Sequence, residues 1–409
     1  MRALLFCSAL FCVSAQAAPW TFDVPLQVSQ DIKTGVFVHL ESAGRKNIAL
    51  SGGVVAVAWE DNRDGMSRCY VAIKTPGQAE FGNAQQVSGV GEAVEPAIVG
   101  LGDGRFAVAW EEDEKIFGRV IKLNPEGKAS SMSEVLQISA KPSTQASLSY
   151  SVLNGLHAAW SEQGKAFHQI MLAKLNITTQ GKLHKAGVTV IDATAKGEQS
   201  YPSVTQSGHK TVVAWEDRSS GYTRLFYAVL QADHKFSGPQ QLNESKWRDP
   251  KNDIGQGGTG VMRVALAAQG QDGVASVWAD KRDFESGYDI YGSFAMGAKL
   301  EFGANEKVQD VFGDSFAQWH PAIAANANGR VVAVWDDDRD GTPDVWLSWH
   351  DLAGWSSDLA VPGASGPAVQ SDPTIVMDEA GNLYLAWVEK SDLNSPSKIM
   401  YTVGYVAEK

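Results

Sequence analysis

Cysteine is scarce in this chain of 409 residues, which has three, and two of them (Cys7 and Cys12) fall near the amino end. That end reads MRALLFCSALFCVSAQA, with one Arg before a short apolar run and small residues after it. The pattern is typical of a secretory signal peptide. We therefore expect residues 1–17 to be removed on export to the bacterial periplasm or the medium. Cys69 is then the single cysteine of a domain over residues 18–409, which excludes an intramolecular disulfide there.

A second long apolar run is missing, so the sequence predicts no transmembrane segment. A basic excess is missing as well, since 35 Lys and Arg stand against 47 Asp and Glu, a net charge of −12. Nucleic-acid binding needs a cationic face, so nucleic acid is excluded as the main partner. The sequence also has no phosphate-binding Gly loop, zinc-type Cys/His cluster or nucleophile elbow. We expect a monomer without a cofactor that takes a glycan or a protein as ligand.

A repeated phrase is the dominant feature of the sequence. Seven apolar segments end in Trp, and several continue with acidic residues and Arg, as in VVAVAWEDNRDG and RVVAVWDDDRDG. The seven tryptophans are Trp59, Trp110, Trp160, Trp215, Trp278, Trp335 and Trp387. Successive steps between them are 51, 50, 55, 63, 57 and 52 residues. A fixed period of this length indicates one structural unit per repeat.

Each unit has the pattern of four short strands. A segment often opened by Pro (EPAIV, YPSV, HPAIA, DPTIV) precedes the Trp strand, and an alternating strand and a short fourth segment follow. The sequence therefore predicts an all-β protein, a seven-bladed β-propeller of four-stranded antiparallel blades. The seventh unit lacks a fourth segment, whereas VPLQVS near the amino end copies one. We expect this amino-terminal strand to join the last blade and close the ring, which removes exposed edges.

The Trp-acidic-x-Arg-x-Gly turn resembles the repeats of secreted sialidase-like and TolB-like propellers, over the whole domain but only at the level of the repeat. Two departures stand out. Sialidases have six blades and Asp-box turns (Ser-x-Asp-x-Gly-x-x-Trp), and no such box occurs here. They also bind one carboxylate with three arginines, a set that this chain matches only in part. Because one fold hosts many functions, the resemblance leaves function open.

Alignment of the units places one polar residue per blade where the innermost strand enters the central channel. These residues are Arg45, Glu95, Gln145, Tyr201, Arg263, His320 and Asp372. They differ from blade to blade, so the repeat itself does not require them. We interpret them as a candidate ligand-binding ring. The alternative is that they pair with one another and with channel water.

Two chemistries are compatible with this ring. A glycoside hydrolase would use Glu95 and Asp372 as paired carboxylates. A uronate lyase would use Tyr201 or His320 as base and acid, with Arg263 neutralising the carboxylate of the substrate. Arg45 and Arg263 could also hold a carboxylate without any reaction. A fourth class, a cell-surface assembly scaffold, would use the outer rims of the blades.

An insertion before blade five, residues 243–262, should enter the same channel mouth. Lys246, Trp247 and Arg248 would give it an aromatic platform and cations suited to an acidic sugar. The alternative is an ordinary Gly-rich surface loop. Trp319, next to His320, is a second stacking surface or a packing residue between blades.

The acidic turns after the Trp strands recur with Asp61 and Arg63, Asp280 and Arg282, and Asp338 and Arg339, with a variant at Asp217 and Arg218. Their recurrence favours a structural device in which Asp caps the turn and Arg bridges to a neighbour. The run Asp336-x-Asp338-x-Asp340-Gly341 also mimics the start of a calcium loop. Leu347 stands where such a loop needs Glu, so calcium is only a minor alternative.

Overall fold

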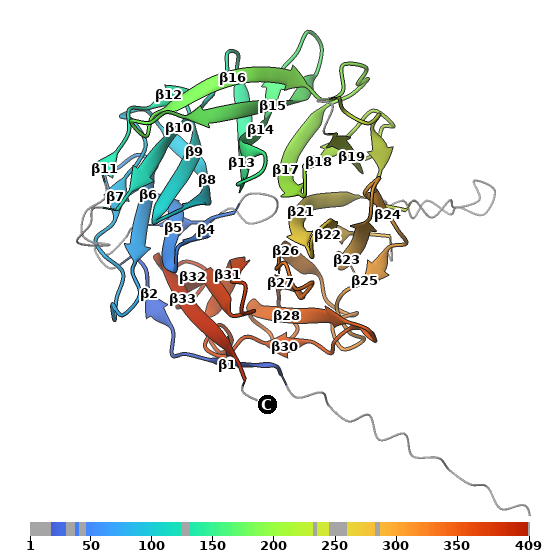
Figure 1. The fold of residues 1–409 in the computed structure, drawn as a ribbon. Helices are drawn as coiled ribbons and strands as arrows, with labels where there is room; N and C mark the ends of the chain where they lie inside the picture. The colour runs from blue at the N-terminus through green and yellow to red at the C-terminus, as the bar shows by residue number, and fades with distance from the viewer. Residues whose placement is uncertain are drawn as a thin grey trace, which may run out of the picture.

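The computed structural model describes residues 18–29, 37–40, 46–123, 131–231, 235–244, 260–282 and 287–407. In these ranges every regular element is a β-strand, and the strands form seven antiparallel sheets. The sheets follow one another around a central axis, as the sequence of colours in Figure 1 shows. The predicted seven-bladed β-propeller is thus confirmed. No helix in the described ranges is long and apolar enough to cross a membrane.

The first four blades follow the chain order. Blade one contains β3 (Val38–His39), β4 (Ile48–Ser51), β5 (Val54–Asp61), β6 (Arg68–Lys74) and β7 (Gln85–Gln86). Blade two contains β8 (Ala93–Gly102), β9 (Arg105–Glu112), β10 (Lys115–Lys122), β11 (Ser131–Met132) and β12 (Leu136–Gln137). Blade three contains β13 (Ser143–Ser151), β14 (Gly155–Gln163), β15 (His168–Ile177) and β16 (Leu183–Val190). Blade four contains β17 (Gln199–Ser207), β18 (Lys210–Asp217), β19 (Arg224–Leu230) and β20 (Gln240–Gln241).

The last three blades complete the ring. Blade five contains β21 (Val261–Gln269), β22 (Gly273–Asp280), β23 (Asp289–Met296), β24 (Glu301–Phe302) and β25 (Glu306–Lys307). Blade six contains β26 (Gln318–Ala325), β27 (Val331–Asp337), β28 (Asp344–Asp351), β29 (Gly354–Trp355) and β30 (Leu359–Ala360). Blade seven contains β31 (Val369–Met377), β32 (Leu383–Lys390) and β33 (Ser397–Val406), joined by β1 (Trp20–Phe22) and β2 (Leu26–Gln27).

The core is divided among the interfaces between blades. Side chains of a strand alternate between its two faces, so each blade presents apolar residues to both neighbours. The described residues form seven apolar clusters, one for each pair of adjacent blades. The seven repeated tryptophans are all fully buried in these clusters. The Trp repeat is therefore the element that packs each blade against the one before it.

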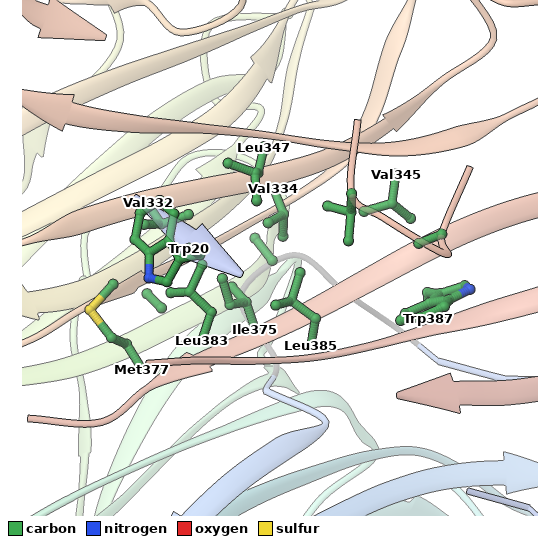
Figure 2. Packing of buried hydrophobic residues seen from close by; sticks show 14 of the residues in the cluster. Trp20, Val332, Val334, Val345, Leu347, Ile375, Met377, Leu383, Leu385 and Trp387 are labelled. Atoms are coloured by element: carbon green, nitrogen blue, oxygen red, sulfur yellow. The ribbon is translucent and has the colours of Figure 1, made fainter. Parts of the chain in front are cut away.

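The ring is closed at blade seven by the amino-terminal strands, as predicted. Leu26 of β2 pairs with Tyr401 of β33, and Trp20 of β1 pairs with Val406. The Trp20 ring packs edge-on against Trp349 of blade six, and its indole nitrogen donates to the Gly381 carbonyl of blade seven at 2.8 Å. Figure 2 shows Trp20 among aliphatic side chains of both blades. The amino end therefore ties blades six and seven together as well as closing the last sheet.

The Asp residues of the acidic turns have the capping role expected of them, and the Arg pairs with the Asp of its own turn. Asp61 accepts hydrogen bonds from the Trp59 indole, at 2.8 Å, and from the Arg63 backbone, at 3.1 Å, and it pairs with the Arg63 guanidinium. Asp280 with Arg282 repeats the arrangement in blade five.

One predicted member of this set was wrong. In blade six the turn carboxylate that pairs with Arg339 is Asp337, which accepts from the Trp335 indole at 3.0 Å, and not Asp338. The reason is the period of two along the strand, which places the second residue after the Trp on the same face as the indole.

Trp20 tests the closure model. Trp20→Ala should lower the free energy of unfolding by about 3–5 kcal/mol, because it removes a large buried aromatic side chain at the closing interface. Val24→Ala, in the same segment but 83% exposed, should leave it nearly unchanged. Urea denaturation of the two variants measures both values. Equal stabilities for Trp20→Ala and the parent would contradict closure by this segment.

Candidate functional site

The predicted ring residues share one backbone conformation. The six ring residues that the structure describes all have a positive φ, between 49° and 62°: Glu95, Gln145, Tyr201, Arg263, His320 and Asp372. Each sits in a register shift of its innermost strand, where the ladder to the next strand skips residues. Each therefore occupies a β-bulge, a feature that re-aims a side chain. All six side chains are partly exposed.

Non-glycine residues with this backbone conformation cost about 1–2 kcal/mol each. The bulges also explain the prolines that open several innermost strands. The residue after the ring position is Pro96, Pro202, Pro321 or Pro373 in four blades, and it lies within the interruption of the ladder. Proline is tolerated there because no ladder hydrogen bond needs its missing N–H.

The backbone N–H of a ring residue is held by a side chain of the preceding blade. Glu60 accepts from the Glu95 N–H at 2.6 Å, Glu216 from the Arg263 N–H at 2.9 Å, and Asp336 from the Asp372 N–H at 3.1 Å. Each acceptor directly follows the repeated Trp. In blade three that position is Ser161, and Gln145 of the ring accepts from the Tyr201 N–H instead, at 2.7 Å. Each of these hydrogen bonds satisfies the backbone N–H of a ring residue, which the strand ladder leaves without an acceptor.

The sequence prediction missed these acceptors, although a signal for them exists. The Trp faces the preceding blade, so the next residue along the strand must face the following blade. The acidic residue after the Trp is thereby placed beside the next ring position. A period-two analysis of the Trp phrase would have found Glu60, Glu216 and Asp336.

Tyr201, Arg263 and Glu216 form one group across blades four and five. The Arg263 guanidinium lies over the Tyr201 ring, 3.4 Å from its centre. The same guanidinium is 3.6 Å from Glu216, whose side chain is 4% exposed. The structure thus brings together the Tyr201 and Arg263 expected of a lyase, and it also gives Arg263 a buried counter-ion.

His320, Asp336 and Asp372 form a second group across blades six and seven. The Nδ1 of His320 is 2.8 Å from Asp336 Oδ1, and its Nε2 is 3.5 Å from Asp372 Oδ1. Ser371 Oγ donates to the other oxygen of Asp372 at 2.8 Å. Burial raises the pKa of Asp336 above its ordinary value, while His320 opposes the shift. The imidazole is thereby oriented by two carboxylates from different blades.

The two carboxylates expected of a hydrolase, Glu95 and Asp372, are not on adjacent blades. They lie on blades two and seven, with blade one between them. His39 of blade one approaches Glu60 at 3.7 Å. Arg45 lies outside the described residues. Its neighbour Lys46 is half-buried, and burial lowers its pKa; it is a cation near the ring that the prediction did not include.

Lys246, Trp247 and Arg248 of the insertion also lie outside the described residues. Trp319 is described, and it packs between blades, which is one of the two roles expected of it. It remains 38% exposed, and its ring packs against Tyr288 of blade five with centres 4.9 Å apart. It thus offers an aromatic surface beside His320.

The calcium-like run is split between two environments. Asp336 is buried and contacts His320, whereas Asp338 and Asp340 are exposed. Among the described residues, no group of three or more His, Cys, Asp or Glu side chains is placed to hold a metal ion.

No family model matches the chain, and no curated protein matches it in sequence. Similar folds occur among solved structures. The endosialidase of phage phi92 is 6% identical with a TM-score of 0.51, over 96% of this chain and 70% of its own. An α-L-arabinanase of Penicillium chrysogenum complexed with arabinobiose is 11% identical with a TM-score of 0.47, over 73% and 90%. The hemagglutinin-neuraminidase of parainfluenza virus 5 is 9% identical with a TM-score of 0.44, over 76% and 89%. At such identities the endosialidase match shows a shared fold alone, which supports the resemblance to sialidase-like propellers at that level.

The bulge conformation gives a direct test. Glu95→Gly should be more stable than Glu95→Ala by about 1 kcal/mol, because only Ala keeps a Cβ in the left-handed region. Both variants lose the same carboxylate, so the comparison isolates the backbone. At Thr21, an exposed position of β1, the order should reverse, since Gly weakens an ordinary strand. Thermal and urea unfolding measure all four variants, and the same order at both sites would contradict the bulge.

Proposed function

We propose that this protein is an exported propeller that binds a glycan at its ring. The observation that carries the proposal is the set of six partly exposed polar side chains, each in a left-handed bulge at the same end of the molecule. Backbone strain of this kind concentrates at functional sites. The bulge is the same in each of these blades, but the six residues differ in type. The bulge therefore does not explain why these particular side chains are present.

The chemistry of the ring suits hydroxyl-rich ligands. Glu95 and Asp372 can accept hydrogen bonds from sugar hydroxyls, while Arg263 and His320 can donate. Trp319 adds an exposed aromatic face on which a sugar ring can stack. A few convergent polar groups beside an aromatic surface are a common design for small-ligand sites.

An acidic glycan is the finer form of the proposal. Arg263 already pairs with Glu216, so a ligand carboxylate would have to share that guanidinium. Recognition of an acidic sugar therefore depends on further cations, for which Arg45, Lys246 and Arg248 are the candidates. A neutral glycan needs none of them.

Export and a monomeric state belong to the same proposal. The signal-like sequence at residues 1–17 supports export to the periplasm or beyond. Cys69 is buried and free, so stability comes from packing rather than from disulfides. The outer strands of blade seven, β1 and β2, come from the same chain, so a second chain is not needed to complete that sheet.

Catalysis is the second candidate, and the contact of His320 with Asp336 favours it. A histidine oriented by a buried carboxylate is a common general acid or base. The class of reaction would be hydrolysis or elimination at a glycosidic bond. In this structure the second nitrogen of His320 faces Asp372, so a substrate would have to take the place of that carboxylate.

A glycan panel tests both candidates. Sialylated, uronate-containing and neutral oligosaccharides are added to the protein, with binding followed by calorimetry and products by mass spectrometry. Asp372→Asn and Trp319→Ala should each weaken the binding of a positive glycan about tenfold or more, because each removes a contact at the ring. Phe312→Ala, exposed at 80% outside the ring, should bind as the parent does.

The products separate the alternatives. Release of a fragment with one added water would indicate a hydrolase, and an unsaturated fragment would indicate a lyase. Binding without any product supports the binding propeller. Binding that survives both ring variants, or that Phe312→Ala reduces equally, would contradict a ring site.

A further inference from the structure

A cavity lies between blades three and four, at the end of the propeller opposite to the ring residues. It has a volume of about 410 Å³, within the range of roughly 300–1,000 Å³ typical of small-molecule sites. Its lining includes Asn154 in the turn from β13 to β14, and Leu230 at the end of β19. Both positions are at the ends of strands remote from the bulges, so this cavity is separate from the ring site.

Blades three and four are packed differently from the other pairs. Their apolar cluster has eight buried residues, the fewest among the described clusters. Blade three also has a fourth strand of eight residues, β16, where the other blades have pieces of two or three residues. Figure 1 shows β16 as a long outer strand. Its residues Gly187 and Thr189 form one wall of the cavity.

The repeat shows which residues depart from the common pattern. The residue four before the repeated Trp is apolar in six blades, but in blade four it is Thr211. The residue three before the Trp is Ala or Val in five blades, but in blade three it is His157. These two polar residues meet across the interface, with Thr211 Oγ1 3.1 Å from His157 Nδ1. Since the other interfaces are built with apolar residues, the fold does not require this polar pair.

The hydrogen bonds of His157 fix which ring nitrogen carries the proton. Nδ1 contacts Thr211 Oγ1 and also Gln206 Nε2 at 3.0 Å. The Gln206 amide nitrogen donates to the Ser149 and Gly155 carbonyls, so it carries hydrogens and cannot accept one. Nδ1 therefore accepts, sharing one of the two amide hydrogens with a carbonyl oxygen, and we assign the proton of the neutral ring to Nε2.

The second nitrogen of His157 has no partner among the described residues. The residue is only 4% exposed, and it lines the cavity. Burial, with the Lys174 ammonium nearby, lowers the pKa of His157 to about 4, so the ring is neutral near pH 7. The result is a fixed N–H donor, buried in the interface and directed at the cavity.

Charge and apolar surface define the complementary ligand. Lys174 is the cross-strand neighbour of His157, so both side chains project from the same face of blade three. None of the described lining residues is an aspartate or a glutamate. Leu172, Leu230 and Phe236 supply an apolar surface beside these donors.

We propose that this cavity binds a small organic carboxylate with an apolar body. One carboxylate oxygen accepts from His157 Nε2–H and the other faces the Lys174 ammonium, while the apolar body contacts Leu172, Leu230 and Phe236. The inference does not depend on the glycan site, because none of these residues belongs to the ring.

Benzoate and hexanoate are suitable probes, with benzamide and hexanamide as uncharged counterparts. Ligand-detected NMR and calorimetry measure binding to the mature protein. Gly187 pairs with Lys174 across β15 and β16, and open space lies where its Cβ would be. Gly187→Phe should therefore fill the cavity and abolish binding. Gly303→Phe, at an exposed glycine of blade five, is the matched control and should bind as the parent does.

The charged partner is tested separately. Lys174→Gln should weaken carboxylate binding about two- to fivefold, as expected for an exposed ion pair, and should leave amide binding unchanged. Lys299→Gln, at a residue that is 82% exposed and does not line the cavity, is its control and should change neither. Amides that bind as tightly as the carboxylates would overturn the carboxylate assignment. Absence of saturable binding by every probe, or parent-like binding by a folded Gly187→Phe protein, would overturn the site.

Discussion

The apolar contact between neighbouring blades is the interaction on which the rest of this molecule depends. A single blade exposes two apolar faces, so it is stable only when both neighbours are present. The repeated Trp supplies the largest side chain at each interface, and its indole is in most blades held by a carboxylate two residues later. The same strand then directs the intervening residue toward the next blade. In blades one, four and six that residue is an acid that fixes the backbone of the ring.

The fold was largely predictable because its determinants are periodic. Seven Trp phrases, four strand-like segments per unit and a copy of the fourth segment near the amino end indicated the number of blades, their strand content and the closure. The positions of the ring residues followed from the same alignment. The backbone conformation of these residues could not be predicted, since a positive φ at Glu95 or Tyr201 has no signature in the residue type itself. The contact of His320 with Asp336 joins two strands of blade six, and Asp372 adds a strand of blade seven, a grouping that spacing alone cannot specify.

Both candidate sites lie where the chain departs from its own repeat. At the ring, a shared backbone geometry presents six different side chains. Between blades three and four, His157 and Thr211 stand in positions that are apolar in most other units. In the sequence alone, a histidine in a Trp strand, as His157 is, cannot be distinguished from an ordinary packing residue, because its partners are not visible there. Departure from an internal repeat is thus the feature by which both proposed sites stand out within a single sequence.

The closure of the ring has a consequence for biosynthesis. Leu26 pairs with Tyr401, so nearly the whole chain lies between the two partners. The first strands to be made must wait for the last, and until then Trp20 has no blade to pack against. Pairing over such a separation is slow, since a large loop must be closed before any contact rewards it. Until the last blade has been made, the closing segment leaves apolar side chains such as Trp20 without their packing partners, and exposed apolar surface of this kind makes a partly folded chain prone to aggregation.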